Sequence, residues 1–236
     1  MKIQREPFLY PIVEKWVKRH FRCFKTAVNK GLSYSRPDVI GIRDTGGNLS
    51  GEVQTIIVEV KKRSEPFAST SGQTFGYNVY ANRIYLAELR DKPFSTDEMD
   101  IASHLGIGLV QIRNRKCDEI LSSPSYAPIQ RLNLRLLESL GLGRCRLCES
   151  FFETGNTKDP WASLIGEDVW KALKEGKGLM FWRQEIAARK RKLGLTKTPK
   201  NYSRERRFLC AECVAEILSV QPERIKSWLS EYGHGG

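Results

Sequence analysis

The sequence predicts an α/β protein in which helices flank a mixed sheet, followed by a smaller, mainly helical domain. Three observations lead to this prediction. Segments with helical and extended periodicity alternate over residues 1–130. Two Cys-x-x-Cys pairs lie beyond residue 130. The 236 residues, of which 40% are hydrophobic, suffice for one large domain or two modest ones. We therefore expect two domains, at 1–130 and 131–236.

Helices and strands are expected in alternation along the first domain. Apolar residues recur every three or four positions from residue 7 to 24, which predicts an amphipathic helix. The β-rich runs 36–44 and 55–62 are joined by a segment rich in glycine and asparagine, which predicts a hairpin. Further patterns predict a short helix (69–81), a strand (83–89), a helix (95–105) and a strand (109–112). Beyond this domain, the pattern over 131–140 predicts another helix.

Two details refine these predictions. Ser95 is followed three residues later by Glu98, the pattern of a capping box at a helix start. In the second domain, the segments 161–170 and 179–192 have helical spacing, so we expect this domain to be mainly helical.

Acidic residues and a lysine mark the two strands of the predicted hairpin. Asp38 opens the first strand, and Glu59 and Lys61 close the second. Side chains alternate between the faces of a strand, so Glu59 and Lys61 project on the same side, about 6.6 Å apart along the chain. Strand pairing would bring Asp38 beside them. Converging carboxylates suit a hard cation such as Mg²⁺, and a neighbouring ammonium can orient a water or counter charge on a phosphate. A Glu59–Lys61 ion pair on a solvated face is the alternative.

These residues resemble the motif of the PD-(D/E)XK nucleases, the restriction-endonuclease-like superfamily. The match consists of Pro37-Asp38, Glu59-Val60-Lys61 and a following helix that carries Gln73, within a helix–strand–strand–helix–strand order. It covers residues 7–115 or so, about half of the chain. The resemblance implies a restriction-endonuclease-like sheet and metal-dependent hydrolysis of phosphodiester bonds.

The resemblance also implies roles for single residues. Asp38 and Glu59 would hold one or two Mg²⁺ or Mn²⁺ ions, with the Val60 carbonyl as a further ligand. Lys61 would position or activate the attacking water. Glu14 resembles the additional acidic residue that many members carry near the metal; the alternative is a solvated helix glutamate.

Gln73 is similar to the glutamine that RecB-like and resolvase-like nucleases place on the helix after the Glu-x-Lys strand. Tyr77, four residues further on, would share its helix face. We interpret Tyr77 as a core aromatic.

Four of the six cysteines form two pairs, Cys145/Cys148 and Cys210/Cys213. Each pair offers two thiolates, and two pairs complete a tetrahedral zinc site with no open position for water, so we expect a structural Zn²⁺ ion. The pattern resembles a treble-clef or zinc-ribbon module in which the residues between the pairs form an insertion. Cys23 and Cys117 are expected to be ordinary reduced cysteines. The alternative to the zinc site is that Cys145/Cys148 and Cys210/Cys213 are two unrelated reduced pairs.

Positive charge concentrates in the same region. The chain has a formal net charge of +12. Residues 158–207 hold 14 Lys+Arg and 6 Asp+Glu, which is 14 − 6 = +8. This excess suits a nucleic-acid backbone, although an exposed basic helix without a partner is the alternative. The expected contacts are the densest basic residues, Arg189, Lys190, Arg191, Lys192, Arg204, Arg206 and Arg207.

Together these features predict a Mg²⁺-dependent deoxyribonuclease, of endonuclease type, with DNA as its partner and a zinc domain that grips the DNA. Two alternatives stay open: a nuclease-like fold that binds nucleic acid or bridges it to a partner without cutting, and a nuclease specific for RNA or branched junctions. A homodimer would explain double-strand cuts, although the sequence does not demand one. The first residues contain no apolar signal segment, and no apolar run in the sequence is long enough to span a membrane, so we expect a soluble, cytoplasmic protein.

Overall fold

The structure is a computed structural model that describes residues 6–32, 35–46, 52–62, 66–145, 148–153, 179–182 and 206–209. The chain divides into two compact units. The first comprises residues 1–48 and 52–140, and the second comprises 49–51 and 141–236. Each unit is described by itself.

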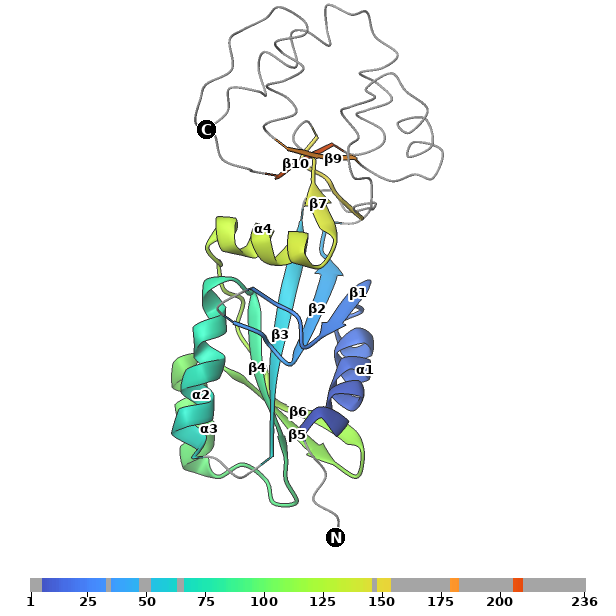
Figure 1. Ribbon diagram of the computed structural model, residues 1–236. Helices are drawn as coiled ribbons and strands as arrows, with labels where there is room; N and C mark the ends of the chain where they lie inside the picture. Colours follow the sequence, from blue (N-terminus) through green and yellow to red (C-terminus); the bar gives the residue numbers. More distant parts are fainter. Residues whose placement is uncertain are drawn as a thin grey trace, which may run out of the picture. The chain divides into compact units, whose positions relative to one another are not determined.

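A mixed six-stranded sheet forms the centre of the first unit (Figure 1). Its strands lie in sequence order: β1 (Lys25–Val28), β2 (Val39–Asp44), β3 (Val53–Lys62), β4 (Arg83–Leu89), β5 (Gly108–Arg113) and β6 (Lys116–Leu121). The pairs β3/β4 and β4/β5 are parallel, and the other three pairs are antiparallel. The parallel pairs require crossover connections, which helices supply.

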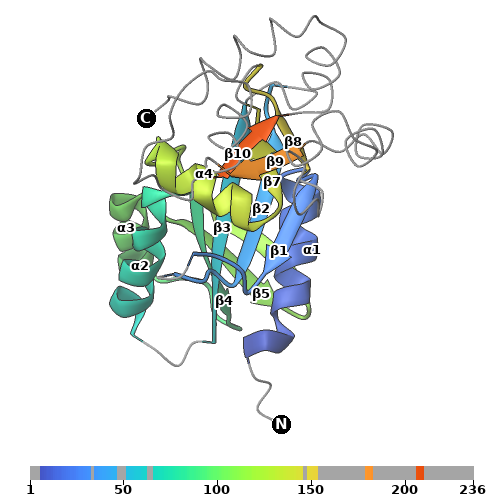
Figure 2. The ribbon, with the colours of Figure 1, turned by 45° about the horizontal axis from the view of Figure 1, so that its top comes forward.

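Helices cover both faces of this sheet. Helix α1 (Tyr10–His20), preceded by the short η1 (Glu6–Phe8), lies on one face. The crossover helices α2 (Phe67–Phe75), with η2 (Gly76–Val79), and α3 (Thr96–Leu105) lie on the other face, as Figures 1 and 2 both show. None of the helices in the described ranges has the length and apolar composition that crossing a membrane requires.

Helix α1 lies unusually close to the sheet at one glycine. Val13 and Val17 are fully buried and pack with Val39 and Val58 of β2 and β3. A Cβ atom at Gly41 would lie 2.4 Å from Val17 Cγ1 and 2.7 Å from Cys23 Sγ. A side chain at this position would therefore push the helix away from β2, so glycine is required for the close packing.

The predicted α/β class, with helices flanking a mixed sheet, and most predicted elements of the first unit are confirmed. The hairpin of β2 and β3 is present, and α3 begins with the capping box of Ser95 and Glu98. The helix predicted over 7–24 is too long, because α1 ends at His20 and Arg22 then adopts a left-handed backbone conformation with φ +54°. Strands β1 and β6 were not predicted. Both are edge strands without a fully buried residue, so their sequences lack the apolar pattern that marks a buried strand.

The boundary between the units lies after α4 (Gln130–Ser139), not before it as the domain prediction at residue 130 has it. Asn133 explains the difference. Its amide nitrogen donates to Thr55 Oγ1 at 3.0 Å and to the Tyr80 carbonyl at 2.8 Å, which fastens α4 to the first unit. Gly141, with φ +79°, follows the helix as a left-handed C-terminal residue.

The described part of the second unit consists of two antiparallel strand pairs. One pairs β7 (Leu142–Arg144) with β8 (Phe151–Glu153), and the other pairs β9 (Leu179–Trp182) with β10 (Arg206–Leu209). The prediction of a helix over 179–192 is wrong for its first four residues. Pairing with a strand far away in sequence, together with the β propensity of the aromatic side chains in β9, outweighs the local helical spacing. The predicted helix over 161–170 lies outside the described residues.

Candidate active site

The β2/β3 hairpin brings the carboxylates of Asp38 and Glu59 together. Val39 pairs with Val58 in an antiparallel ladder. Asp38, which precedes Val39, therefore lies beside Glu59, which follows Val58. The backbone N–H of Val60 donates to Asp38 Oδ2 at 2.8 Å, which fixes the Asp38 carboxylate against β3. The two carboxylates therefore occupy neighbouring positions at the same end of the hairpin.

Side-chain alternation decides which face of the sheet carries the site. Val58 and Val60 of β3 belong to the core that packs against α1. Glu59 and Lys61 alternate with them and therefore project toward the opposite face, which α2 and α3 cover. Both are buried, with 3% and 9% of their surface exposed. A buried carboxylate and a buried ammonium need partners.

Glu59 receives a partner on each oxygen. Tyr77 of η2 donates its hydroxyl to Glu59 Oε2 at 2.7 Å, and Lys61 Nζ lies 3.2 Å from Glu59 Oε1. Gln73 of α2 donates in turn from its amide nitrogen to Tyr77 Oη at 3.4 Å. The ring of Tyr77 is buried, as the interpretation as a core aromatic requires, but its hydroxyl also belongs to the site. The four-residue spacing between Gln73 and Tyr77 is the sequence signal that points to this shared face.

The electrostatic environment of the Glu59 carboxylate favours binding of a cation beside it. Burial and the neighbouring negative charge of Asp38 raise the pKa of Glu59, and the contacts from Tyr77 and Lys61 offset only part of that rise. Burial and the Glu59 carboxylate likewise raise the pKa of Tyr77, so this hydroxyl remains a donor. Two carboxylates that repel each other, both hard oxygen donors, match the preference of Mg²⁺ or Mn²⁺. The residues present therefore fit a divalent cation.

The raised pKa of Glu59 predicts a pH dependence of stability in buffer without divalent cations. The folded chain holds the Glu59 proton to a higher pH than the unfolded chain, whose value is near 4.5. Between the two pKa values the stability contributed by this group falls as the pH rises. Thermal melts from pH 4.5 upward should show this loss in the wild type and a flatter profile in Glu59→Gln. Parallel profiles for the two proteins would contradict the prediction.

Glu14 is not brought into this cluster by any described contact. It lies on α1, half-buried, and accepts a hydrogen bond from Thr26 Oγ1 at 2.7 Å. Thr26 pairs with Gly41, whose missing side chain faces α1, so Thr26 and Glu14 meet on the α1 face of the sheet. Glu59 and Lys61 project from the other face. The assignment of Glu14 to the site thus depends on the resemblance alone.

A second charged network, which the sequence did not indicate, lies next to Lys61. Glu88 of β4 is the register partner of Lys61 and is 2% exposed. Arg90 binds it through Nη1 at 3.2 Å and binds Glu98 of α3 through Nη2 at 2.8 Å. Arg90 also lies over the ring of Phe94, 3.9 Å from its centroid. With 3% of its surface exposed, Arg90 holds this end of the sheet together and does not reach solvent.

The first cysteine pair lies at the tip of the β7/β8 hairpin. Cys145 is buried and Cys148 is exposed, with its sulfur 2.9 Å from Ser150 Oγ. The Cys145 N–H donates to the Ser150 carbonyl at 2.8 Å, and the Glu149 N–H donates to the Cys145 carbonyl at 3.1 Å. Glu149 has a φ of +62°, a left-handed conformation that costs a residue with a side chain roughly 1–2 kcal/mol. This tight turn brings both cysteines of the pair to one end of the hairpin.

The second cysteine pair, Cys210 and Cys213, lies outside the described residues. Strand β10 nevertheless ends one residue before Cys210, as β7 ends one residue before Cys145. The two strands are in contact within the second unit. Strands that lead into the two pairs therefore lie together although the pairs are far apart in sequence, and thiolates fit a zinc ion. Within the described ranges, no three thiol, imidazole or carboxylate side chains converge on one possible metal site.

Two cysteines, Cys23 and Cys117, and the predicted basic contacts lie outside the two cysteine pairs. Burial raises the pKa of both the Cys23 and the Cys117 thiol to about 12, so both stay protonated at neutral pH, as expected for ordinary reduced cysteines. Arg206 and Arg207 belong to β10. The remaining predicted basic contacts, namely Arg189, Lys190, Arg191, Lys192 and Arg204, lie outside the described residues.

Comparisons with known proteins add one structural similarity. No protein-family model matches the sequence, and no curated protein matches it. Among solved structures, the chain is similar to SPO1766, a protein of unknown function from Silicibacter pomeroyi, with 17% sequence identity and a TM-score of 0.43. The similarity covers 59% of this chain and 86% of that chain.

Proposed function

We propose that the protein is a metal-dependent nuclease of the PD-(D/E)XK type that hydrolyses DNA phosphodiester bonds. The observation that carries this proposal is the position of Asp38 beside Glu59, with the Lys61 ammonium 3.2 Å from the Glu59 carboxylate. A bound Mg²⁺ or Mn²⁺ ion would supply a Lewis acid for the phosphate and acidify a water molecule. Asp38, Glu59 and the Val60 carbonyl are the groups that would hold it.

The surrounding residues have defined tasks in this proposal. Tyr77 orients Glu59 by donating to Oε2, and Gln73 holds the hydroxyl of Tyr77. Lys61 holds its positive charge beside Glu59, where it can orient the attacking water and counter the negative charge that develops on the phosphate. Glu59 and Lys61 are buried, whereas Asp38 is half-buried and Gln73 is exposed. In this proposal a substrate phosphate would approach from the side of Asp38 and Gln73.

The second unit is proposed to be a zinc module that binds nucleic acid. Cys145 and Cys148 at the tip of the hairpin, together with Cys210 and Cys213, would form a structural four-thiolate site. The contact between β7 and β10 supports this pairing. The basic residues between the two cysteine pairs would then contact phosphates.

A cleavage assay with Mg²⁺ against single-stranded, double-stranded and branched DNA and against RNA tests the function. The purified chain is expected to cut DNA, and to do so only when Mg²⁺ or Mn²⁺ is present. Cutting of RNA or of junctions alone would assign one of the alternative substrates. Binding of nucleic acid without cutting any substrate under either metal would contradict the proposal in favour of a binding or scaffold role.

A further inference from the structure

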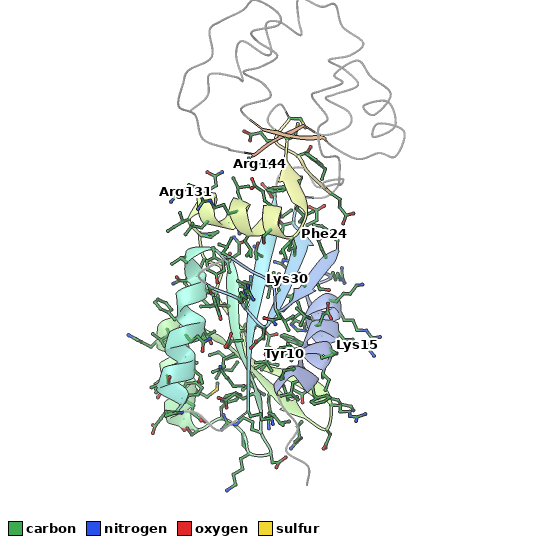
Figure 3. The ribbon with its side chains drawn as sticks, viewed as in Figure 1. Tyr10, Lys15, Phe24, Lys30, Arg131 and Arg144 are labelled. Atoms are coloured by element: carbon green, nitrogen blue, oxygen red, sulfur yellow. The ribbon has the colours of Figure 1, made fainter. Side chains whose placement is uncertain are left out.

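The solvent-facing side of α1 carries a row of positive charge. It consists of Lys15, Lys18 and Arg19 on the helix and Arg22 in the turn that follows, here called the α1 stripe. The spacing i, i+3 and i+4 puts Lys15, Lys18 and Arg19 on one side of the helix, and Arg22 follows in the turn after it. All four are exposed, and Figure 3 shows Lys15 pointing away from the sheet. The apolar side of the helix packs on the core, opposite to the stripe.

The described side chains around the α1 stripe do not neutralise its charge. None of the four side chains has an ion-pair or hydrogen-bond partner within the part of the chain that the structure describes. The single acidic residue of α1, Glu14, accepts its hydrogen bond from Thr26. Neighbouring like charges at these spacings destabilise a helix. The helix dipole favours cations only in the last turn and so does not account for Lys15.

Exposed aromatic side chains lie at both ends of the same helix. Phe8, just before α1, is 67% exposed, and Phe24, just after it, is 40% exposed. Cations that follow a phosphate backbone position nucleic acid, and exposed aromatic rings are surfaces on which unpaired bases stack. A lipid surface fits less well, because an interfacial helix inserts its apolar side and here Val13 and Val17 are fully buried in the core.

We propose that the α1 stripe binds the phosphate backbone of nucleic acid, as a second contact surface besides the basic segment of the second unit. This inference rests on the proposed function for the identity of the partner. It extends that function because the stripe belongs to the unit that carries the candidate active site.

The test measures binding of a 30-bp DNA duplex over a series of salt concentrations, without added Mg²⁺, for the wild type and two matched variants. Lys15→Gln/Arg19→Gln removes two stripe cations four residues apart. Arg131→Gln/Arg135→Gln removes two exposed cations with the same spacing from α4, where Figure 3 shows Arg131. Each phosphate contact contributes about 0.9 to the slope of log K against log salt. The magnitude of the slope should be smaller by about 1.8 in the stripe variant than in the wild type, because two contacts are lost. The α4 variant should keep the wild-type slope.

The outcomes separate this inference from the proposed function. An unchanged slope in the stripe variant, or an equal loss in both variants, would overturn the inference even if the wild type cleaves DNA. A wild type that binds DNA through the stripe but cuts no substrate would support the inference and contradict the nuclease. Stripe-dependent binding to vesicles of anionic lipid, with DNA binding unaffected by the stripe, would overturn the inference in favour of a membrane surface. Circular dichroism melts confirm that both variants fold.

Discussion

The Glu59→Gln protein is expected to lose Mg²⁺-dependent DNA cleavage by at least about 10³-fold while keeping its fold. A bound metal contributes several kcal/mol of transition-state stabilisation, and each 1.36 kcal/mol corresponds to a factor of about ten in rate. Glutamine keeps the shape of the side chain and can still accept the hydrogen bond from Tyr77, but it removes the negative charge. Because burial and Asp38 disfavour that charge in the fold, the variant should melt at or above the wild-type temperature without metal.

A matched control exists in the same sheet. Glu119 of β6 also accepts a hydrogen bond from a buried tyrosine, since Tyr85 Oη lies 2.9 Å from its Oε1, but β6 is an edge strand that does not adjoin β3. Glu119→Gln should therefore retain cleavage. A second measurement does not depend on the substrate: Mg²⁺ should raise the melting temperature of the wild type and of Glu119→Gln, but not that of Glu59→Gln. Wild-type cleavage by Glu59→Gln would rule out the assigned site.

Removal of zinc is expected to have the largest effect on stability. Structural zinc sites contribute about 10–16 kcal/mol at neutral pH, and this binding energy is folding energy. Cys145→Ser, or treatment with a chelator, should therefore unfold the second unit and leave the first unit folded. Hydrogen exchange measured by mass spectrometry can follow the units separately, with loss of protection expected in β7 to β10 and none in β1 to β6.

Elemental analysis provides the second readout of the zinc prediction. We expect one zinc ion per wild-type chain and a marked loss of zinc in Cys145→Ser. Cys117→Ser is the matched control, because Cys117 lies in β6 of the first unit and outside the two pairs. A wild type without zinc, or a Cys145→Ser protein with unchanged exchange in the second unit, would contradict the zinc module.

The sequence predicts some contacts of the candidate active site and not others. The hairpin that aligns Asp38 with Glu59 was predictable, because turn residues and two β-rich runs close together in sequence determine it. The contact between Tyr77 and Glu59 was not, because it depends on how η2 packs against β3. The pairing of Lys61 with Glu88 in the register of parallel strands likewise joins residues from separate elements. Glu14 was assigned to the site by resemblance, whereas its described contact is with Thr26.

The α/β class, the alternation of helices and strands in the first unit and the capping box at Ser95 are predictable from residue patterns, because they depend on periodicity and on neighbours within a few residues. Three other features depend on tertiary contacts: the edge strands β1 and β6, the extended conformation of β9, and the attachment of α4 to the first unit. Their backbone or side-chain hydrogen bonds go to partners that are distant in sequence. Local patterns cannot reveal such partners, because the free energy that selects them is gained only when the chain has brought those segments together.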